Sequence, residues 1–212
     1  MGGDLPKQFL LLGGRPVLMH TLQTFRAAYA DMHIVLVLPK SQQSYWQTLC
    51  EQYAFDMPLE IADGGAERFH SVSNGLSCIP VTDDGLVAVH DGVRPLVSVD
   101  TIRRCFERAE TDDTAVPVVP VVETLRRIHP DGSSQTQDRS AYRLVQTPQV
   151  FRISLLRQAY RQPYQSSFTD DASVVEALGH SIALVDGNRE NIKLTTPADL
   201  LLAESVLKNR TT

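Results

Sequence analysis

The sequence predicts an α/β fold, in which a mostly parallel sheet carries helices on both faces and a β-hairpin arm protrudes from it. Two observations support this prediction. Short apolar runs alternate along the chain with amphipathic stretches, which is the pattern of strand–helix units in a parallel sheet. One long segment, residues 123–147, interrupts this alternation and is too polar to belong to a core.

The first half of the chain predicts three strands and three helices. The apolar runs that predict strands are residues 33–38, 59–65 and 85–91. The amphipathic stretches that follow them predict helices over residues 44–55, 67–79 and 98–110. We expect Ser41 to cap the first of these helices and Ser98 the third, because a serine hydroxyl accepts a hydrogen bond from the first helical turn.

The second half of the chain is less regular. Residues 114–122 are apolar, but Pro117 and Pro120 cannot donate hydrogen bonds to a neighbouring strand, so we expect this segment near an edge of the sheet. A further strand is predicted over residues 181–187. The last helix is predicted over residues 195–209, since Thr196 is a good N-cap and is followed by Pro197 and Asp199 in the first turn.

The polar segment 123–147 predicts the arm. Two β-leaning limbs flank the turn sequence His129–Gly132, and the tip is rich in Ser and Gln. One interpretation is a protruding hairpin that joins two copies of the chain, and the other is a mobile surface loop. No linker divides the sequence, so residues 1–212 are expected to form a single domain.

Composition excludes several classes of protein. The net charge of −5 argues against a nucleic-acid surface, which needs a basic stripe. No apolar run approaches the ~20 residues that span a bilayer, and nothing resembles a signal peptide. The three cysteines form no C-x-x-C pair and read as reduced thiols, so we expect a cytoplasmic protein. A small anionic ligand remains compatible with a few cations in a cleft.

Candidate site residues follow the predicted strands, because ligands of open α/β sheets bind beyond the carboxyl ends of the strands. Gly64 and Gly65 come after one strand, where bare backbone can lie against a planar ligand. Asp91 ends another strand, three residues before Arg94. A carboxylate beside a guanidinium suits a Mg²⁺-phosphate site, and equally a structural ion pair that shapes a turn.

Cations are expected to gather around these positions if the ligand carries phosphates. The candidates are Lys7, Arg68, Arg94, Arg139 and Lys193. His70 and His90 are expected to be structural, and the sequence contains no Ser-His-Asp or H-E-x-x-H arrangement. Lys7 follows a glycine pair at Gly2 and Gly3, as in a phosphate-binding loop, but no strand precedes that pair.

Six short motifs resemble one known family. They are "PKQF", "DGGAERFHSV", "VHDGVRP", "TPQVF", "TDDAS" and "NIKLTTPADLLLAE". They occur in the order and spacing of 2-C-methyl-D-erythritol 4-phosphate cytidylyltransferases, and the resemblance covers essentially the whole chain. The resemblance implies a Rossmann-like nucleotidyltransferase sheet and cytidylyl transfer from CTP to methylerythritol phosphate, with Mg²⁺. It also implies a homodimer whose arms interlock.

The resemblance assigns roles to residues of this sequence. Lys7, Arg139 and Lys193 resemble the catalytic cations, and Asp91 resembles the carboxylate beside the metal. The nucleotide side comprises Gly65, Ala66, Arg68, Ser71 and Asp91. The methylerythritol phosphate side comprises Asp91, Arg94, Thr124, Arg139, Thr147, Thr169 and Lys193. Thr124 and Arg139 lie on the arm and are expected to reach the partner subunit's site.

The sequence departs from the family at its beginning. Met1 and Gly2 resemble the last two residues of a glycine-rich loop, so we expect the gene to start roughly twenty residues upstream, with a strand and an arginine-bearing loop. Two alternatives remain. A ribitol 5-phosphate cytidylyltransferase would share the fold and the chemistry. A non-catalytic nucleotide-binding dimer would retain binding without turnover.

Overall fold

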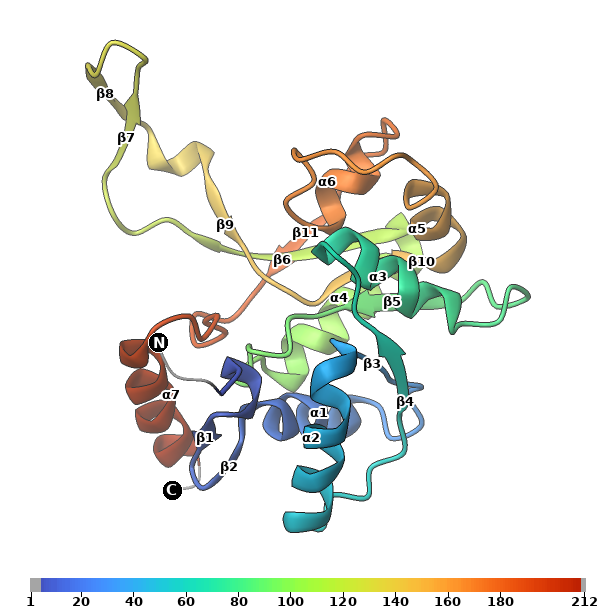
Figure 1. The fold of residues 1–212 in the computed structure, drawn as a ribbon. Coiled ribbons are helices and arrows are strands. Elements are labelled where there is room, and N and C mark those ends of the chain that lie inside the picture. The colour runs from blue at the N-terminus through green and yellow to red at the C-terminus, as the bar shows by residue number, and fades with distance from the viewer. Residues whose placement is uncertain (1–4, 211–212) are drawn as a thin grey trace.

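The computed structural model describes residues 5–210 of the chain, so the expectation on Met1 and Gly2 lies outside the described residues. Its central sheet has five strands, with β11, β6, β10 and β5 side by side and β9 also paired to β6. Their bounds are β5 Leu86–Val89, β6 Thr114–Pro120, β9 Arg143–Val145, β10 Gln149–Arg152 and β11 Leu184–Asp186. The predicted α/β fold is confirmed (Figure 1).

The sheet is mixed, because its strands do not all run in the same direction. β11 pairs with β6 in parallel, whereas β10 lies between β6 and β5 and is antiparallel to both. β9 is also antiparallel to β6. Strand–helix alternation does not predict β10, since it follows the arm directly and no helix separates them.

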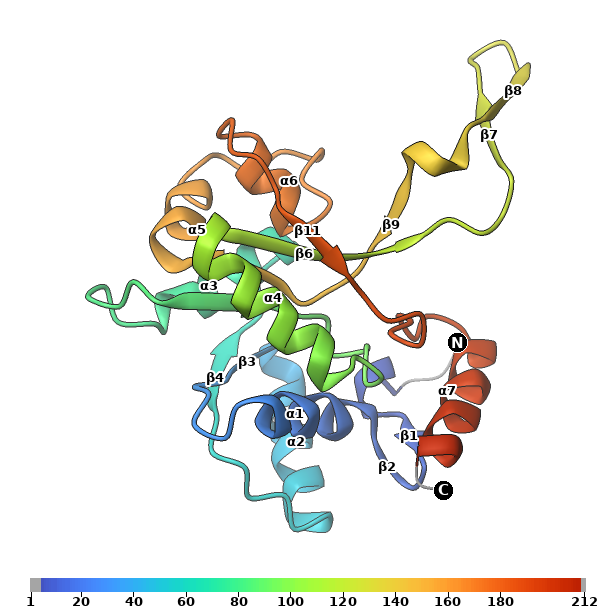
Figure 2. The ribbon, with the colours of Figure 1, turned by 180° about the vertical axis from the view of Figure 1, so that it is seen from behind.

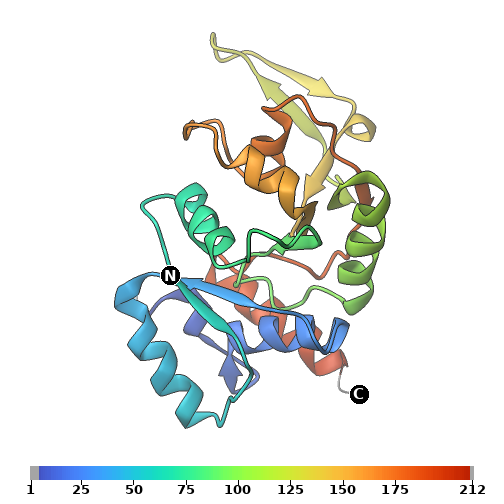
Figure 3. The same cartoon turned by 90° about the vertical axis from the view of Figure 1, so that its right-hand side faces the viewer.

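Successive residues along these strands face opposite layers of helices. Ala115 of β6 packs with Cys105 of helix α4 (Val99–Asp112). Its neighbour Val116 packs on the other face, in the cluster that contains Phe69 of α3 (Arg68–Ser77). The short helices α5 (Ile153–Ala159) and α6 (Asp171–Glu176) complete that second layer. Figures 2 and 3 show the sheet between α4 and α3, so the expectation of helices on both faces is confirmed.

A second, smaller unit lies beside the central sheet. Strands β3 (Val35–Leu38) and β4 (Glu60–Asp63) form a parallel pair. Leu36 and Leu38 pack against α1 (Val17–Ala28) and α2 (Lys40–Gln52), in a cluster centred on the fully buried Trp46. The hairpin of β1 (Leu11–Leu12) and β2 (Arg15–Pro16) turns at Gly13 and Gly14, which both have positive φ.

Segment 114–122 was expected at an edge, and this expectation is wrong. β6 has neighbours on both sides, namely β11 along one side and β9 and β10 along the other. Pro117 is accommodated because it falls between the part of β6 that pairs with β10 and the part that pairs with β9. Its carbonyl still accepts a hydrogen bond from the Gln146 N–H at 2.8 Å.

The helix ends agree with two of the three predicted caps. Ser98 Oγ accepts a hydrogen bond from Thr101 N at 3.0 Å. Thr196 Oγ1 accepts from Asp199 N, whose carboxylate accepts in return from Thr196 N, at the start of α7 (Pro197–Arg210). Ser41 caps nothing, because α2 begins one residue earlier, after Pro39.

The arm is a hairpin that projects away from the sheet (Figures 1 and 2). Strands β7 (Leu125–Ile128) and β8 (Ser134–Gln137) are antiparallel. The carboxylate of Asp131 accepts hydrogen bonds from the backbone and side chain of Ser133, which fixes the turn at the tip. The chain returns through a short 3-10 helix, Arg139–Ala141, and re-enters the sheet as β9.

Candidate active site

Asp91 is the centre of a charged cluster at the end of β5. Its Oδ2 atom accepts a hydrogen bond from Arg94 Nε at 3.0 Å and lies 3.3 Å from Lys193 Nζ. Both cations therefore reach the same carboxylate oxygen. No residue in the described part of the chain forms a hydrogen bond or an ion pair with Oδ1 of Asp91.

The cluster keeps the Asp91 carboxylate ionised. Burial on its own raises the pKa of this group, but the charges of Lys193, Arg94 and Arg68 act in the opposite direction. The net result is a pKa of Asp91 below its ordinary value. The structural ion pair with Arg94 that the sequence allowed is present, and Lys193 adds a second cation from a distant segment.

Thr147 connects this cluster to a buried histidine. Thr147 Oγ1 accepts a hydrogen bond from Asp91 N at 3.2 Å and lies 2.9 Å from His90 Nδ1. His90 Nε2 lies 3.2 Å from the carbonyl oxygen of Arg94, which can only accept. His90 thus carries its proton on Nε2 and accepts on Nδ1. Burial lowers the pKa of His90 to about 4, so the ring is neutral near pH 7, in agreement with a structural role.

Asn191 ties two of these residues together, although the sequence did not single it out. The residue is completely buried, and its Nδ2 donates to the carbonyl of Thr147 at 2.8 Å. The backbone carbonyl of Asn191 accepts a hydrogen bond from Arg94 Nη1 at 2.8 Å. The one feature of the sequence that could have pointed to Asn191 is its position two residues before Lys193, in the same motif.

The glycine turn after β4 leads into α3 and is braced by Ser71. Gly65 N donates to Ser71 Oγ at 3.0 Å, and that hydroxyl donates to the carbonyl of Glu67 at 3.2 Å. A Cβ atom at Gly65 would lie 2.3 Å from Cβ of His70, which requires a glycine here. Gly65 and Ala66 are both exposed, so the turn offers bare backbone to a ligand.

Arg68 is the first residue of α3, directly after this turn. Its Nη2 atom lies 2.5 Å from Oδ2 of Asp171, a residue with no exposed surface. Its charge also contributes to the lowered pKa of Asp91. We therefore place the candidate site at the Asp91 cluster and the glycine turn, where Arg68, Arg94 and Lys193 supply the positive charge that suits phosphate groups.

Comparisons with known proteins identify the family. The family model of 2-C-methyl-D-erythritol 4-phosphate cytidylyltransferases matches residues 1–209. The chain belongs to this family. Proteins of that name from Phocaeicola vulgatus and Bacteroides thetaiotaomicron are 58% and 56% identical to it, over 98% of this chain and 93% of theirs. The solved structure of the cytidylyltransferase from Thermus thermophilus has a TM-score of 0.77 at 36% identity, covering 96% of this chain and 94% of that one.

The remaining residues that the family resemblance singled out lie outside the cluster. Lys7 is exposed on the 3-10 helix η1 (Lys7–Phe9), and its ammonium forms no ion pair with a described residue. Thr169 is exposed and lies two residues before the start of α6. Thr124 and Arg139 belong to the arm, where Arg139 Nη1 donates to the carbonyl of Val122. The arm projects away from the central sheet, to which strand β5 beside Asp91 belongs (Figure 1).

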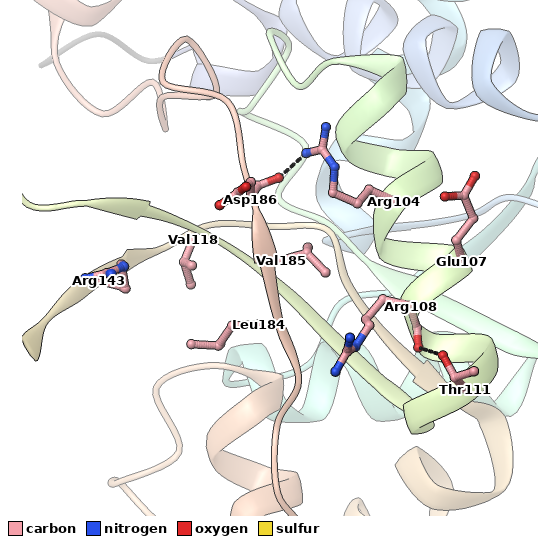
Figure 4. A pocket seen from close by; sticks show the side chains of 9 residues that line it. All are labelled: Arg104, Glu107, Arg108, Thr111, Val118, Arg143, Leu184, Val185 and Asp186. Carbon is pink, nitrogen blue, oxygen red and sulfur yellow. Dashed lines mark hydrogen bonds between the residues drawn. The ribbon is translucent and has the colours of Figure 1, made fainter.

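A groove of about 690 Å³ lies elsewhere, between α4 and the edge strand β11 (Figure 4). Three arginines line it, but each already donates to a protein acceptor: Arg104 to Asp186, Arg108 to Asp112 and Arg143 to Ser140. None of the residues expected in the cytidylyltransferase site lines this groove. We therefore place the site at Asp91 and not here.

Two further observations concern the described residues as a whole. Among residues 5–210, no three His, Cys, Asp or Glu side chains come together in a way that would hold a metal ion. None of the helices in the same range combines the length and the apolar character that crossing a bilayer requires.

Proposed function

We propose that this chain transfers a cytidylyl group from CTP to 2-C-methyl-D-erythritol 4-phosphate, a step of isoprenoid biosynthesis. The products are CDP-methylerythritol and pyrophosphate. Membership of the family across residues 1–209 carries this conclusion. The ribitol phosphate and non-catalytic alternatives are not favoured, because the curated relatives reported above bear the methylerythritol phosphate name.

The reaction joins two polyanions. A phosphate oxygen of methylerythritol phosphate attacks the α-phosphorus of CTP, a new P–O bond forms, and the bond to the β-phosphate oxygen breaks. Pyrophosphate leaves with the electron pair of that bond. Because the second pKa of the attacking phosphate is ~6, it is already ionised near neutral pH and needs no general base. His90 is neutral and engaged on both ring nitrogens, which suits a reaction without a base.

Catalysis then consists of positioning and charge stabilisation. We assign the methylerythritol phosphate to Arg94, Lys193, Thr147 and Thr169, since the first three already meet at Asp91. We assign the cytosine to the exposed turn of Gly65 and Ala66 with Ser71, and the triphosphate to Arg68 and Lys7. These assignments rest on the geometry of the cluster and on the motifs that carry the family resemblance.

A divalent cation fits this site if the phosphates of the nucleotide supply some of its ligands. Mg²⁺ is commonly held by one or two carboxylates together with substrate phosphates. Asp91 offers one oxygen, Oδ1, that no described residue occupies, while its other oxygen is held by Arg94 and Lys193. We propose that Mg²⁺ binds Asp91 and the phosphates of CTP, where it would withdraw charge from them.

The arm supports the proposal of a homodimer. Val122, Ile128, Tyr142 and Leu144 are exposed apolar side chains on the arm or at its base. Thr124 and Arg139 lie on the arm, which projects away from the central sheet (Figure 1). We propose that they complete the partner's site. We also propose that residues 1–212 are one nucleotidyltransferase domain and that its location is cytoplasmic, given its three free thiols.

A turnover assay tests the function directly. Pyrophosphate release is measured with CTP, Mg²⁺ and either methylerythritol phosphate or ribitol 5-phosphate. We expect release with the first polyol phosphate and at least a hundredfold less with the second. Faster turnover of ribitol 5-phosphate would show that ribitol 5-phosphate, and not methylerythritol phosphate, is the substrate. Binding of CTP without any turnover would support the non-catalytic alternative.

A further inference from the structure

Arg68, Tyr160 and Asp171 form a hydrogen-bonded triad beside the helix that follows the glycine turn. Asp171 has no exposed surface, and its two carboxylate oxygens have different partners. Oδ2 pairs with Arg68 Nη2 at 2.5 Å, and Oδ1 accepts a hydrogen bond from Tyr160 Oη at 2.6 Å. Both oxygens of a buried carboxylate are therefore satisfied, which is the condition for keeping such a charge in a core.

The triad joins three separate segments of the chain. Arg68 begins α3, Tyr160 directly follows α5 and Asp171 begins α6. The ring of Tyr160 also stacks on Phe69 at a centroid distance of 4.6 Å, so the phenol is held from two sides. Asp171 and Tyr160 are consequently fixed by the core before any ligand binds.

Arg68 is the one member of the triad that reaches the site. Its side chain is 36% exposed, in contrast to the buried Asp171. Within residues 5–210, its Nε and Nη1 groups donate to no protein acceptor. The guanidinium thus has one edge held by the core and further donors left for a ligand.

The charge of a second carboxylate, Asp91, also acts on Arg68. Burial disfavours the charged guanidinium, but Asp171 raises the pKa of Arg68, and Asp91 adds a smaller effect in the same direction. Asp91 itself forms ion pairs with Arg94 and Lys193.

We propose that Asp171 is a positioning residue that holds the Arg68 guanidinium in place after the glycine turn, so that its remaining donors bind the triphosphate of CTP. This inference rests on the proposed function. Tyr160 supports Asp171 by fixing the carboxylate plane. Asp170, the residue before Asp171, accepts a hydrogen bond from the buried Gln149 at 2.7 Å, so the backbone that carries Asp171 is itself anchored to β10.

A double-mutant cycle on the whole chain tests this role. The variants are Asp171→Asn, Arg68→Met and their combination, and CTP binding is measured by calorimetry in the presence of Mg²⁺. We expect Asp171→Asn to raise the dissociation constant for CTP about tenfold, since one charge-assisted hydrogen bond is lost. In the Arg68→Met background the same change should have no further effect, because Asp171 acts through Arg68.

The kinetic readout separates positioning from general damage. Asp171→Asn should raise the KM for CTP and leave the KM for methylerythritol phosphate within about twofold of wild type. Asp112→Asn, which breaks the exposed pair with Arg108, is the matched control and should change neither constant.

Two outcomes overturn the proposal: an unchanged CTP affinity in folded Asp171→Asn, or additive effects in the double variant. If Asp171→Asn does not fold, Tyr160→Phe removes only the hydroxyl. It should weaken CTP binding about threefold, and unchanged binding would again overturn the proposal. A wild-type protein that binds CTP without turnover would count against the proposed function and leave this test intact.

Discussion

Lys193 and Asp91 form an ion pair, 3.3 Å from Nζ to Oδ2, between two segments that are far apart in the sequence. Asp91 follows β5, and Lys193 lies in the loop between β11 and α7. Since Arg94 reaches the same oxygen, two cations share one carboxylate. The cluster therefore carries excess positive charge, which favours the approach of phosphate groups.

Removal of the carboxylate tests the centre of this cluster. We expect Asp91→Asn to reduce turnover at least a hundredfold and to leave the fold intact, because it removes the proposed metal ligand and the shared acceptor of Arg94 and Lys193. Steady-state kinetics and thermal unfolding measure the two quantities. Near-normal turnover in this variant would exclude Asp91 from the reaction.

Lys7 is tested in the same way, although it lies outside the cluster. Lys7→Ala should also reduce turnover about a hundredfold or more, since loss of one preorganised charge stabiliser raises the barrier by about 3–4 kcal/mol. Lys40→Ala, another exposed lysine at the start of α2, is the control and should leave turnover unchanged. Equal rates for the two variants would remove Lys7 from the proposed site.

The arm can be tested by complementation between subunits. Arg139→Ala and Lys193→Ala are each expected to be nearly inactive. A mixture of the two should recover activity after subunit exchange, because a heterodimer contains one site with both residues intact. Exchange is followed with differently tagged subunits. If the tags show exchange and activity stays absent, Arg139 does not act in the partner's site.

The glycine turn offers a pair of matched substitutions. Gly65→Ala would place a methyl group 2.3 Å from Cβ of His70 and 2.9 Å from its backbone carbon, so the turn must move. We expect weaker CTP binding by about tenfold or more, and a lower melting temperature. Gly85→Ala meets no atom within 4 Å and should change neither property. Calorimetry and thermal unfolding compare them, and equal CTP affinity in both variants would contradict the role of this turn.

His90 predicts a defined loss of stability in acid. Its pKa is about 4 in the folded protein and 6.5 in the unfolded chain, so between these values only the unfolded chain binds the proton. The stability that the neutral ring contributes is therefore full above pH 6.5 and declines as the pH falls toward about 4. The loss amounts to about 3 kcal/mol, from about 1.4 kcal/mol per pKa unit.

Urea unfolding at several pH values measures this effect. The free energy of unfolding of wild type should fall more steeply between pH 6.5 and 4 than that of His90→Gln, which cannot take up the proton. The difference between the two curves isolates His90 from Asp91, whose protonation also destabilises the fold in acid. His129→Gln, on the exposed arm, should follow the wild-type curve, and the same slope in His90→Gln would refute the prediction.

Local patterns were sufficient for most elements of the fold. Apolar runs located β3, β4, β5 and β11, and the caps at Ser98 and Thr196 set the starts of α4 and α7, because these signals depend only on neighbouring residues. The antiparallel strand β10 escaped prediction, since its direction depends on how the chain returns from the arm. The prolines of β6 suggested an edge position, and this was wrong because their surroundings depend on other segments. Pro117 fits inside the sheet since β10 pairs with β6 before it and β9 pairs with β6 after it.

The motifs were enough to predict the family and the residue types of the site, because the charge and hydrogen-bonding groups of a side chain are known from its residue type. Which side chains touch depends on the path of the whole chain. Lys193 meets Asp91 only because β11 lies parallel to β6, which directs the following loop toward the end of β5. Asp171 looked like any other acidic residue in "TDDAS". Its burial against Arg68 and Tyr160 arises only when α3, α5 and α6 pack over one face of the sheet.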